Sequence, residues 1–201
     1  MKKTAALLVA RASLLAGASL LASVARPALA TDGTVFLGVG KPTDRRGTDF
    51  DWGPVLAGSL GGRISDYASL HGQLTMSLLD PDVPDSDGNF VQLAFVPMIH
   101  LLGDRADVDL VLGPQLGLYR MWGEFDFTII SGDIREWGLE AGLLAGAFFA
   151  VSKTLSIGMY VEYSHLFPQE LCVEIRNGPD DCDDDDLDES NFLSFGLGLR
   201  F

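Results

Sequence analysis

Three neighbouring residues, Glu162, Ser164 and His165, carry side chains that could catalyse a hydrolysis. A serine becomes a nucleophile when a histidine lies within hydrogen-bond distance of its hydroxyl group. The residues on either side alternate between large apolar and small or polar types, which predicts a β-strand. Adjacent residues of a strand point to opposite faces, so Ser164 and His165 cannot act together as nucleophile and base. No other serine–histidine pair stands out, and the sequence predicts a protein that is not an enzyme.

Acidic residues are concentrated in two segments, 80–89 and 168–190, whose carboxylate oxygens could bind a divalent cation. Residues 85–89 read Asp-Ser-Asp-Gly-Asn, similar to part of a calcium-binding loop, but the full spacing of such a loop is absent. Solvated acidic loops that bind no specific ion are the alternative. No other cofactor is expected. The candidate ligands for Ca²⁺ or another divalent cation are Asp85, Asp87, Asp183, Asp184, Asp185 and Asp186.

Residues 1–30 have the pattern of a secretory signal peptide: Lys2 and Lys3, a short apolar run, and a small-x-small tripeptide at 28–30. An uncleaved anchor is the alternative, but the apolar run is shorter than the ~20 residues that a spanning helix needs. Cleavage after Ala30 leaves residues 31–201 as one domain with 10 basic and 28 acidic residues, a formal charge of −18. This charge makes a nucleic-acid partner improbable, because little would displace phosphate counterions.

The two cysteines, Cys172 and Cys182, lie ten residues apart in the second acidic segment. Export places them in an oxidising compartment, and no histidine close by completes a metal site. We therefore expect a local disulfide bond between them.

Eight segments of residues 31–201 alternate between apolar and small or polar residues, the pattern of half-buried strands. The connections between them alternate between short (65–67, 102–107, 152–154) and long (42–53, 80–89, 122–133, 168–190). An even number of strands with short turns on one side and long loops on the other predicts an eight-stranded antiparallel up-and-down transmembrane β-barrel. The predicted strands are 34–41, 54–64, 68–79, 90–101, 108–121, 134–151, 155–167 and 191–201.

The last predicted strand carries its apolar residues at alternate positions, Leu193, Phe195, Leu197, Leu199 and Phe201. This pattern resembles the closing strand of bacterial outer-membrane β-barrels, in which such residues and a final phenylalanine serve as the assembly signal. Together with the loop layout, it makes residues 31–201 similar to the OmpA-like and OmpX-like barrels, without a periplasmic domain. The resemblance implies an outer-membrane location with both mature termini in the periplasm. It also implies outer-membrane lipid, lipopolysaccharide and the barrel-assembly machinery as partners of a monomer.

The large apolar face supplies too many bulky side chains for the interior of a small barrel, so we expect it to face lipid and the glycine-rich face to line the lumen. In register, Gly146 should face Tyr160, and Phe148 should face Gly158. Pro97 and Pro114 lie inside predicted strands, where they cannot donate hydrogen bonds, so a bulge or local distortion is expected where these strands meet.

The lumen is then expected to hold a polar cluster of Arg63, His100, Asp109, Arg200, Glu140 and Glu162. The first four lie near the short-turn ends of their strands and are expected to form salt bridges. Glu140 and Glu162 have no basic partner at the same level along the barrel axis. They could form hydrogen bonds with Tyr119, Tyr160 or Gln115, or stay protonated.

These features favour an integral outer-membrane protein with a packed lumen and a structural or surface-interaction role. Its acidic outer loops would meet cations or external partners. A narrow ion channel is one alternative function, and a lipid-A-modifying enzyme is another.

Overall fold

The computed structural model of the chain describes residues 31–43, 50–81, 87–102, 107–126, 131–175, 180–183 and 187–201. The predicted signal peptide, residues 1–30, lies outside these ranges. Within them, no helix is long and apolar enough to cross a membrane.

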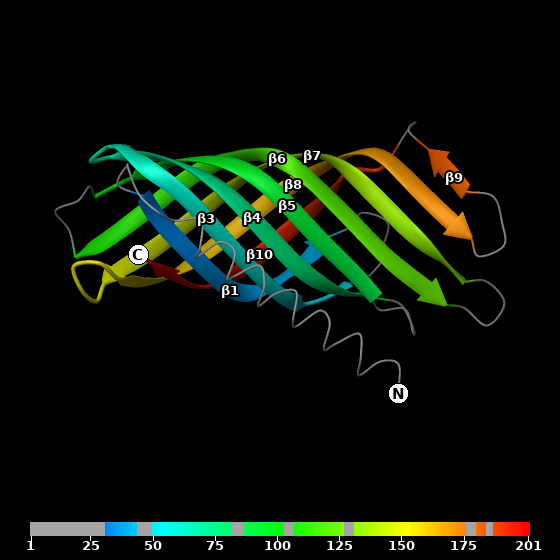
Figure 1. Cartoon of the computed structure of the whole chain (residues 1–201), viewed down its shortest axis with the longest axis horizontal. Coiled ribbons are helices and arrows are strands. Elements are labelled where there is room, and N and C mark those ends of the chain that lie inside the picture. The colour runs from blue at the N-terminus through cyan, green and yellow to red at the C-terminus, as the bar shows by residue number, and fades with distance from the viewer. Residues whose placement is uncertain are drawn as a thin grey trace.

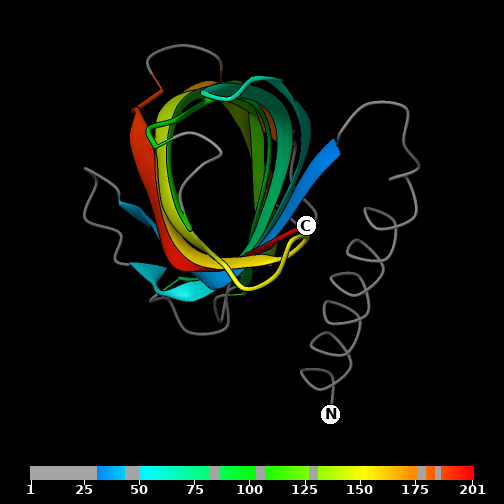
Figure 2. The same cartoon turned by 90° about the vertical axis from the view of Figure 1, so that its left-hand side faces the viewer.

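Eight antiparallel strands form a closed ring (Figures 1 and 2). Each strand pairs with the next along the chain, and the last pairs with both the strand before it and the first. The predicted eight-stranded antiparallel barrel is therefore confirmed. The eight strands are β1 (Thr31–Thr43), β3 (Gly53–Ser65), β4 (Ala68–Pro81), β5 (Asp87–His100), β6 (Val108–Asp126), β7 (Ser131–Ala150), β8 (Ser156–Ile175) and β10 (Ser190–Arg200).

Two short strands lie outside the ring. β2 (Phe50–Asp51) pairs with the end of β4, and β9 (Asp180–Asp183) pairs with the end of β8. We call the end of the barrel that carries β9 the loop end, and the opposite end, near residues 66–67 and Phe201, the turn end (Figure 1).

Two strands continue well past their predicted ends, β6 to Asp126 instead of 121 and β8 to Ile175 instead of 167, and β7 begins at Ser131, three residues before its predicted start. β6, β7 and β8 have 19, 20 and 20 residues, whereas a tilted strand needs only about 9–11 residues to cross a bilayer. The expected long loops 122–133 and 168–190 are thus largely strand. Their charged residues suggested loops, but pairs such as Trp122 with Arg135 extend the ladder without interruption. We call residues 122–126, 131–137, 170–175 and 180–183 the protruding sheet.

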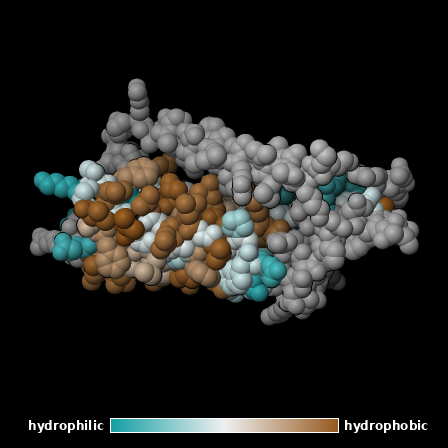
Figure 3. All heavy atoms as spheres, turned by 90° about the horizontal axis from the view of Figure 1, so that it is seen from below, coloured by the Kyte–Doolittle hydropathy of each residue, from teal (hydrophilic) through white to brown (hydrophobic). Residues whose placement is uncertain are grey.

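The two faces of the barrel wall divide as predicted. Large apolar side chains point outward and are exposed, for example Leu37 (64%), Leu116 (63%) and Leu197 (66%). Polar side chains point inward, and Glu162 and Gln92 are both fully buried. The space-filling view shows the apolar residues gathered over the body of the barrel (Figure 3). This is the reverse of a water-soluble protein, in which buried polar groups are the exception.

The strand register places Gly146 opposite Tyr160 and Phe148 opposite Gly158, as predicted. The phenylalanine ring lies where a side chain on Gly158 would stand. Glycine at this position therefore lets an aromatic ring pack flat against the barrel wall.

Apolar side chains fill the lumen at two levels. Near the turn end, the rings of Phe36 and Tyr160 lie 4.3 Å apart between their centroids, and near the loop end the rings of Phe90 and Phe192 stack at 4.3 Å. We call these groups the turn-end plug (Phe36, Ala57, Ala94, Val96, Met98, Val111, Leu144, Phe148 and Tyr160) and the loop-end plug (Val55, Leu79, Phe90, Tyr119, Leu166 and Phe192).

Candidate functional site in the barrel interior

A salt-bridge cluster lies at the turn end of the lumen, centred on Asp109. Its Oδ2 atom lies 2.6 Å from Nη1 of Arg200, 2.8 Å from Nδ1 of His100 and 3.5 Å from Nη2 of Arg63. Nε of Arg63 also lies 3.2 Å from Oδ2 of Asp32. The structure thus brings together four of the six residues expected in the polar cluster. It adds Asp32, which no feature of the sequence singles out.

A chain of hydrogen bonds leads from this cluster to two further residues on β4. Ser69 Oγ lies 2.8 Å from Nε2 of His100 and 2.8 Å from Nε2 of His71. When neutral His100 carries its proton on Nδ1 and donates it to Asp109, its Nε2 accepts a hydrogen bond from the hydroxyl group of Ser69. Ser69 in turn accepts a hydrogen bond from His71. Ser69 and His71 occupy alternate positions on the inner face of β4, but only the three-dimensional register shows that they meet His100.

Ser69, His100 and Asp109 have the order and distances of a nucleophile, a general base and the acid that orients it. Sequence reasoning missed this set because its members lie on three different strands. The surroundings do not suit an acyl substrate, since all three side chains are buried. The adjoining cavity, lined by His71, His100 and Arg200 among others, has a volume of about 10 Å³, close to the minimum for one water molecule.

A second group of polar side chains lies between the two plugs. We call it the middle cluster, and its members are Gln73, Gln92, Gln115, Glu140, Glu162 and Ser164. The carboxylate of Glu162 accepts hydrogen bonds from the side-chain amides of Gln73 (3.1 Å), Gln92 (2.8 Å) and Gln115 (3.0 Å). The amides of Gln92 and Gln115 also bond to Ser164 Oγ. One carboxylate is therefore held by donors from three strands.

Glu140 belongs to the middle cluster, with Gln92, Ser164 and Glu162 as neighbours. It is 2% exposed, and neither of its carboxylate oxygens makes a hydrogen bond of normal geometry, although the side chains of Gln92 and Ser164 lie close enough to act as weak donors. Of the partners considered for the two glutamates, Gln115 bonds to Glu162, whereas the hydroxyl group of Tyr119 donates to Glu136 at 2.6 Å. The six predicted residues thus divide into two clusters at different levels along the barrel axis, the salt-bridge cluster at the turn end and the middle cluster.

Ser164 and His165 point to opposite faces, as the strand pattern predicted. Ser164 is buried in the lumen. His165 lies on the outer wall, with Nδ1 2.7 Å from Oδ1 of Asn191 and Nε2 2.9 Å from Oε2 of Glu189. Oδ1 of Asn191 also accepts a hydrogen bond from the hydroxyl group of Tyr163 at 2.7 Å.

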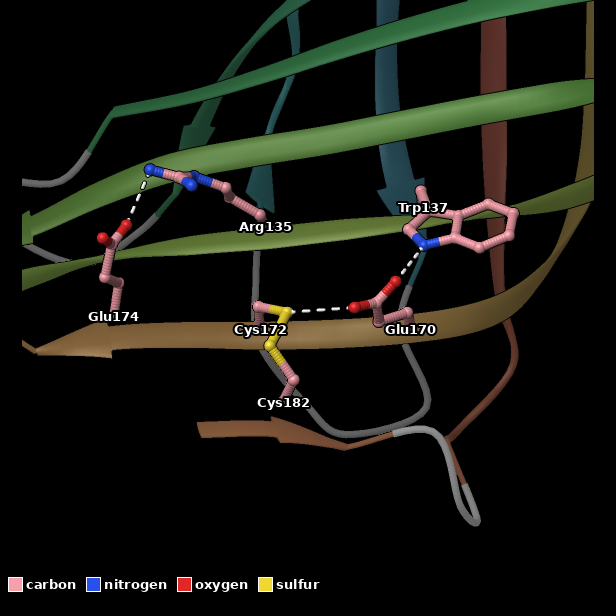
Figure 4. The surroundings of a disulfide bond; sticks show 6 residues. All are labelled: Arg135, Trp137, Glu170, Cys172, Glu174 and Cys182. Carbon is pink, nitrogen blue, oxygen red and sulfur yellow. Dashed lines mark hydrogen bonds and ion pairs between the residues drawn. A yellow bond between two sulfur atoms is a disulfide. The ribbon is translucent and has the colours of Figure 1, made fainter. Parts of the chain in front are cut away.

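The predicted disulfide bond joins Cys172 and Cys182 in the protruding sheet (Figure 4). The two residues lie directly opposite each other on β8 and β9. Nearby, Nε1 of Trp137 donates to Glu170 at 2.6 Å, and Nη2 of Arg135 lies 2.7 Å from Oε2 of Glu174. These contacts lie on the outer face of the sheet and are exposed to solvent.

Most of the predicted calcium ligands lie outside the described residues, namely Asp85, Asp184, Asp185 and Asp186. Asp87 begins β5 opposite Glu124, and Asp183 lies in β9 opposite Leu171. Among residues that the structure describes, one surface group of possible ligands is Glu170, Cys172 and Cys182. Its two sulfur atoms are joined to each other, so it does not offer thiolate ligands.

A closed ring of eight antiparallel strands, apolar outside and polar within, is the fold of the small outer-membrane β-barrels. Solved structures confirm this class. Neisserial surface protein A has a TM-score of 0.61 at 15% identity, with 85% of this chain and 95% of that chain covered. A major outer membrane protein from Thermus thermophilus has a TM-score of 0.57 at 14% identity, with 86% and 100% covered.

Ail, the attachment invasion locus protein of Yersinia pestis, has a TM-score of 0.54 at 15% identity, with 85% of this chain and 97% of that chain covered. No family model matches the sequence, and no curated protein matches it. At these identities the similarity establishes the fold.

Proposed function

We propose that the protein is an integral protein of a bacterial outer membrane with a structural or surface-interaction role. The observation that carries the proposal is the outward face of the barrel. Large side chains there, such as Leu37, Leu116 and Leu197, are more than half exposed, whereas the lumen is polar at two levels. Contiguous apolar surface of this extent supports contact with lipid rather than water.

The filled lumen supports a structural role over transport. The turn-end and loop-end plugs close the lumen on either side of the middle cluster. A solute would have to displace packed aromatic rings to pass. A narrow ion channel is the competing function, and the middle cluster would be its selectivity region.

The protruding sheet supports the surface role. Its strands extend beyond the length needed to cross a bilayer, and a disulfide bond fastens its last strand. It is acidic, with Glu170, Glu174, Asp181 and Asp183 among its residues. Such a surface suits cationic partners or loosely bound divalent ions outside the cell. The turn end, with both mature termini, would then face the periplasm.

Membrane insertion is tested by refolding residues 31–201 in the presence of lipid vesicles. Flotation of the folded protein with the vesicles is expected, together with a mobility change on unheated gels. Folded, monodisperse protein in detergent-free buffer would contradict the proposal. Insertion into planar bilayers separates the two functions. A structural barrel gives no steady conductance, whereas steady conductance that changes in the Glu162→Gln variant would establish a channel.

An enzymatic role is tested at Ser69 and on lipid. The refolded protein is incubated with a fluorophosphonate that labels activated serines, and lipid A is examined by mass spectrometry with and without the protein. We expect no labelling and no change in lipid A. Labelling that disappears in the Ser69→Ala variant would show that the buried triad is active.

A further inference from the structure

The middle cluster contains more hydrogen-bond acceptors than donors. The amide nitrogens of Gln73, Gln92 and Gln115 all point at Glu162, so their oxygens must point elsewhere. None of these three amide oxygens makes a hydrogen bond, and the oxygens of Glu140 make none of normal geometry, with Gln92 and Ser164 as their nearest donors. Rotating an amide group to satisfy its oxygen would remove a donor from Glu162. The surplus of acceptors is therefore built into the arrangement.

Charge gives an independent reason to expect a positively charged ligand. The middle cluster contains two carboxyl groups, Glu140 and Glu162, and no lysine or arginine in the part of the chain that the structure describes. Arg63 and Arg200 also reach the lumen, but they are engaged with Asp32 and Asp109 at the turn end. A carboxylate buried without hydrogen bonds or a counter-charge is strongly destabilising.

The middle cluster is enclosed on both sides. Along β8, Glu162 and Ser164 lie between Tyr160 of the turn-end plug and Leu166 of the loop-end plug. Along β5, Gln92 lies between the same two plugs. An ion held here would exchange slowly with the solvent and would be bound mainly through protein oxygens.

We propose that the middle cluster binds one divalent cation of the calcium class through Glu140 and the amide oxygens of Gln73, Gln92 and Gln115, with the carboxylate of Glu162 supplying a second negative charge nearby. Calcium accepts carboxylate and amide oxygens in flexible geometry with a coordination number of about 6–8. Magnesium demands a near-ideal octahedron and keeps several of its waters, for which the packed lumen leaves little room. Two carboxylates match the charge of a divalent ion, and the ion satisfies the surplus acceptors.

The proposal is tested by refolding residues 31–201 in detergent with CaCl₂ and then removing accessible calcium with EDTA and gel filtration. Calcium that remains is measured by mass spectrometry of the elements. We expect about one calcium per chain in the wild type, as for a single occluded site. Protein refolded in EDTA from the start should contain none and should unfold at a lower temperature.

Three variants locate the ion. Glu140→Gln is nearly isosteric, and this variant should retain at least ten-fold less calcium than the wild type. Gln73→Met removes one amide oxygen while keeping both carboxylates, and it should lose calcium partially. Asp181→Asn, on the exposed β9, is the control and should retain as much calcium as the wild type. The Gln73 variant keeps the test decisive if the Glu140 variant does not fold.

Two outcomes would overturn the proposal. One is wild-type protein that retains no calcium after EDTA, which would leave buried water or a proton to satisfy the acceptors. The other is calcium that is retained equally by the Glu140→Gln and Gln73→Met variants, or that is lost in Asp181→Asn. That result would place the ion in the acidic loops.

Discussion

Pro97 of β5 and Pro114 of β6 lie opposite each other. Any other two residues at these positions would donate a backbone hydrogen bond to each other. The register runs unchanged from Phe95 with Leu116 to Ile99 with Leu112, but no pairs join the residues between them. Leu101 N–H donates to the directly opposite Leu110 at 2.8 Å. Hydrogen-bonded sites alternate along an antiparallel pair, so the two prolines occupy such a site.

Replacing both prolines with valine should supply two missing donors without disturbing the register. Each restored hydrogen bond is expected to add about 1 kcal/mol to the free energy of unfolding. Urea unfolding in micelles measures the gain, and hydrogen exchange should show new protected amides at 97 and 114. Unchanged exchange across β5 and β6 would show that the strands are held apart by something other than the prolines.

Asp109 is the acceptor on which the turn-end cluster depends. Asp109→Asn should lower the free energy of unfolding by at most about 3–5 kcal/mol, because it leaves the part-buried Arg200 without its carboxylate partner, whereas Arg63 keeps its ion pair with Asp32. Asp133→Asn is the matched control, since Asp133 lies 3.8 Å from Arg135 on the exposed sheet, where an ion pair contributes about 0–1 kcal/mol. Equal losses in the two variants would contradict the central role of Asp109.

Gly158 provides the space for the Phe148 ring. A methyl group at 158 would clash with the backbone oxygen of Ala147 and would lie 2.6 Å from Cδ1 of Phe148, so Gly158→Ala should destabilise the barrel by about 1–3 kcal/mol through overpacking. Gly72→Ala is the control, because a Cβ atom at 72 has no neighbour within 4 Å. Thermal unfolding of the two variants in the same micelles compares them. A similar effect of both would show that the lumen can rearrange around the ring.

Leu116 lies near the middle of the outward apolar run of β6, and Leu102 lies beyond the strand end at the turn end. If lipid surrounds the barrel, Leu116→Arg should cost about 2–4 kcal/mol and Leu102→Arg only about 0–1 kcal/mol. Reversible unfolding from lipid vesicles measures both. Two equal and small costs would mean that the outer face does not meet hydrocarbon.

The disulfide bond should stabilise β9 and leave the barrel unaffected. Closing so short a loop contributes about 3 kcal/mol at most, and among the described strands β9 pairs with β8 alone. In the Cys172→Ser, Cys182→Ser double variant, amides 181–183 should exchange faster while those of the barrel do not change. Slow exchange retained in β9 would show that pairing with β8 suffices without the cross-link.

The strand pattern was enough to predict the ring and the two faces of its wall. Alternation put Arg63, His100, Asp109 and Arg200 on the inner face near the ends of their strands, and the structure brings them within bonding distance. The protruding sheet was not predictable in this way. Its charged residues, such as Asp133 and Glu174, have low strand propensity, and pairing with neighbouring strands outweighs that preference.

The middle cluster shows a second limit of the sequence. Gln73, Gln92 and Gln115 lie 89, 70 and 47 residues from Glu162 along the chain. Their convergence depends on the stagger between strands when the sheet closes, and alternation alone does not determine the stagger. The buried Ser69–His100–Asp109 set was missed for the same reason.

The pairing of β10 with β1 means that the first and last strands depend on each other for their hydrogen bonds. A chain that stopped before Ser190 would leave β1 and much of β8 with unsatisfied backbone groups along one side. Inside a hydrocarbon layer those groups have no water to bond to. A truncated molecule could therefore not close its barrel. It would stay outside the bilayer, exposed to proteolysis, so the pairing of β1 with β10 selects for complete chains.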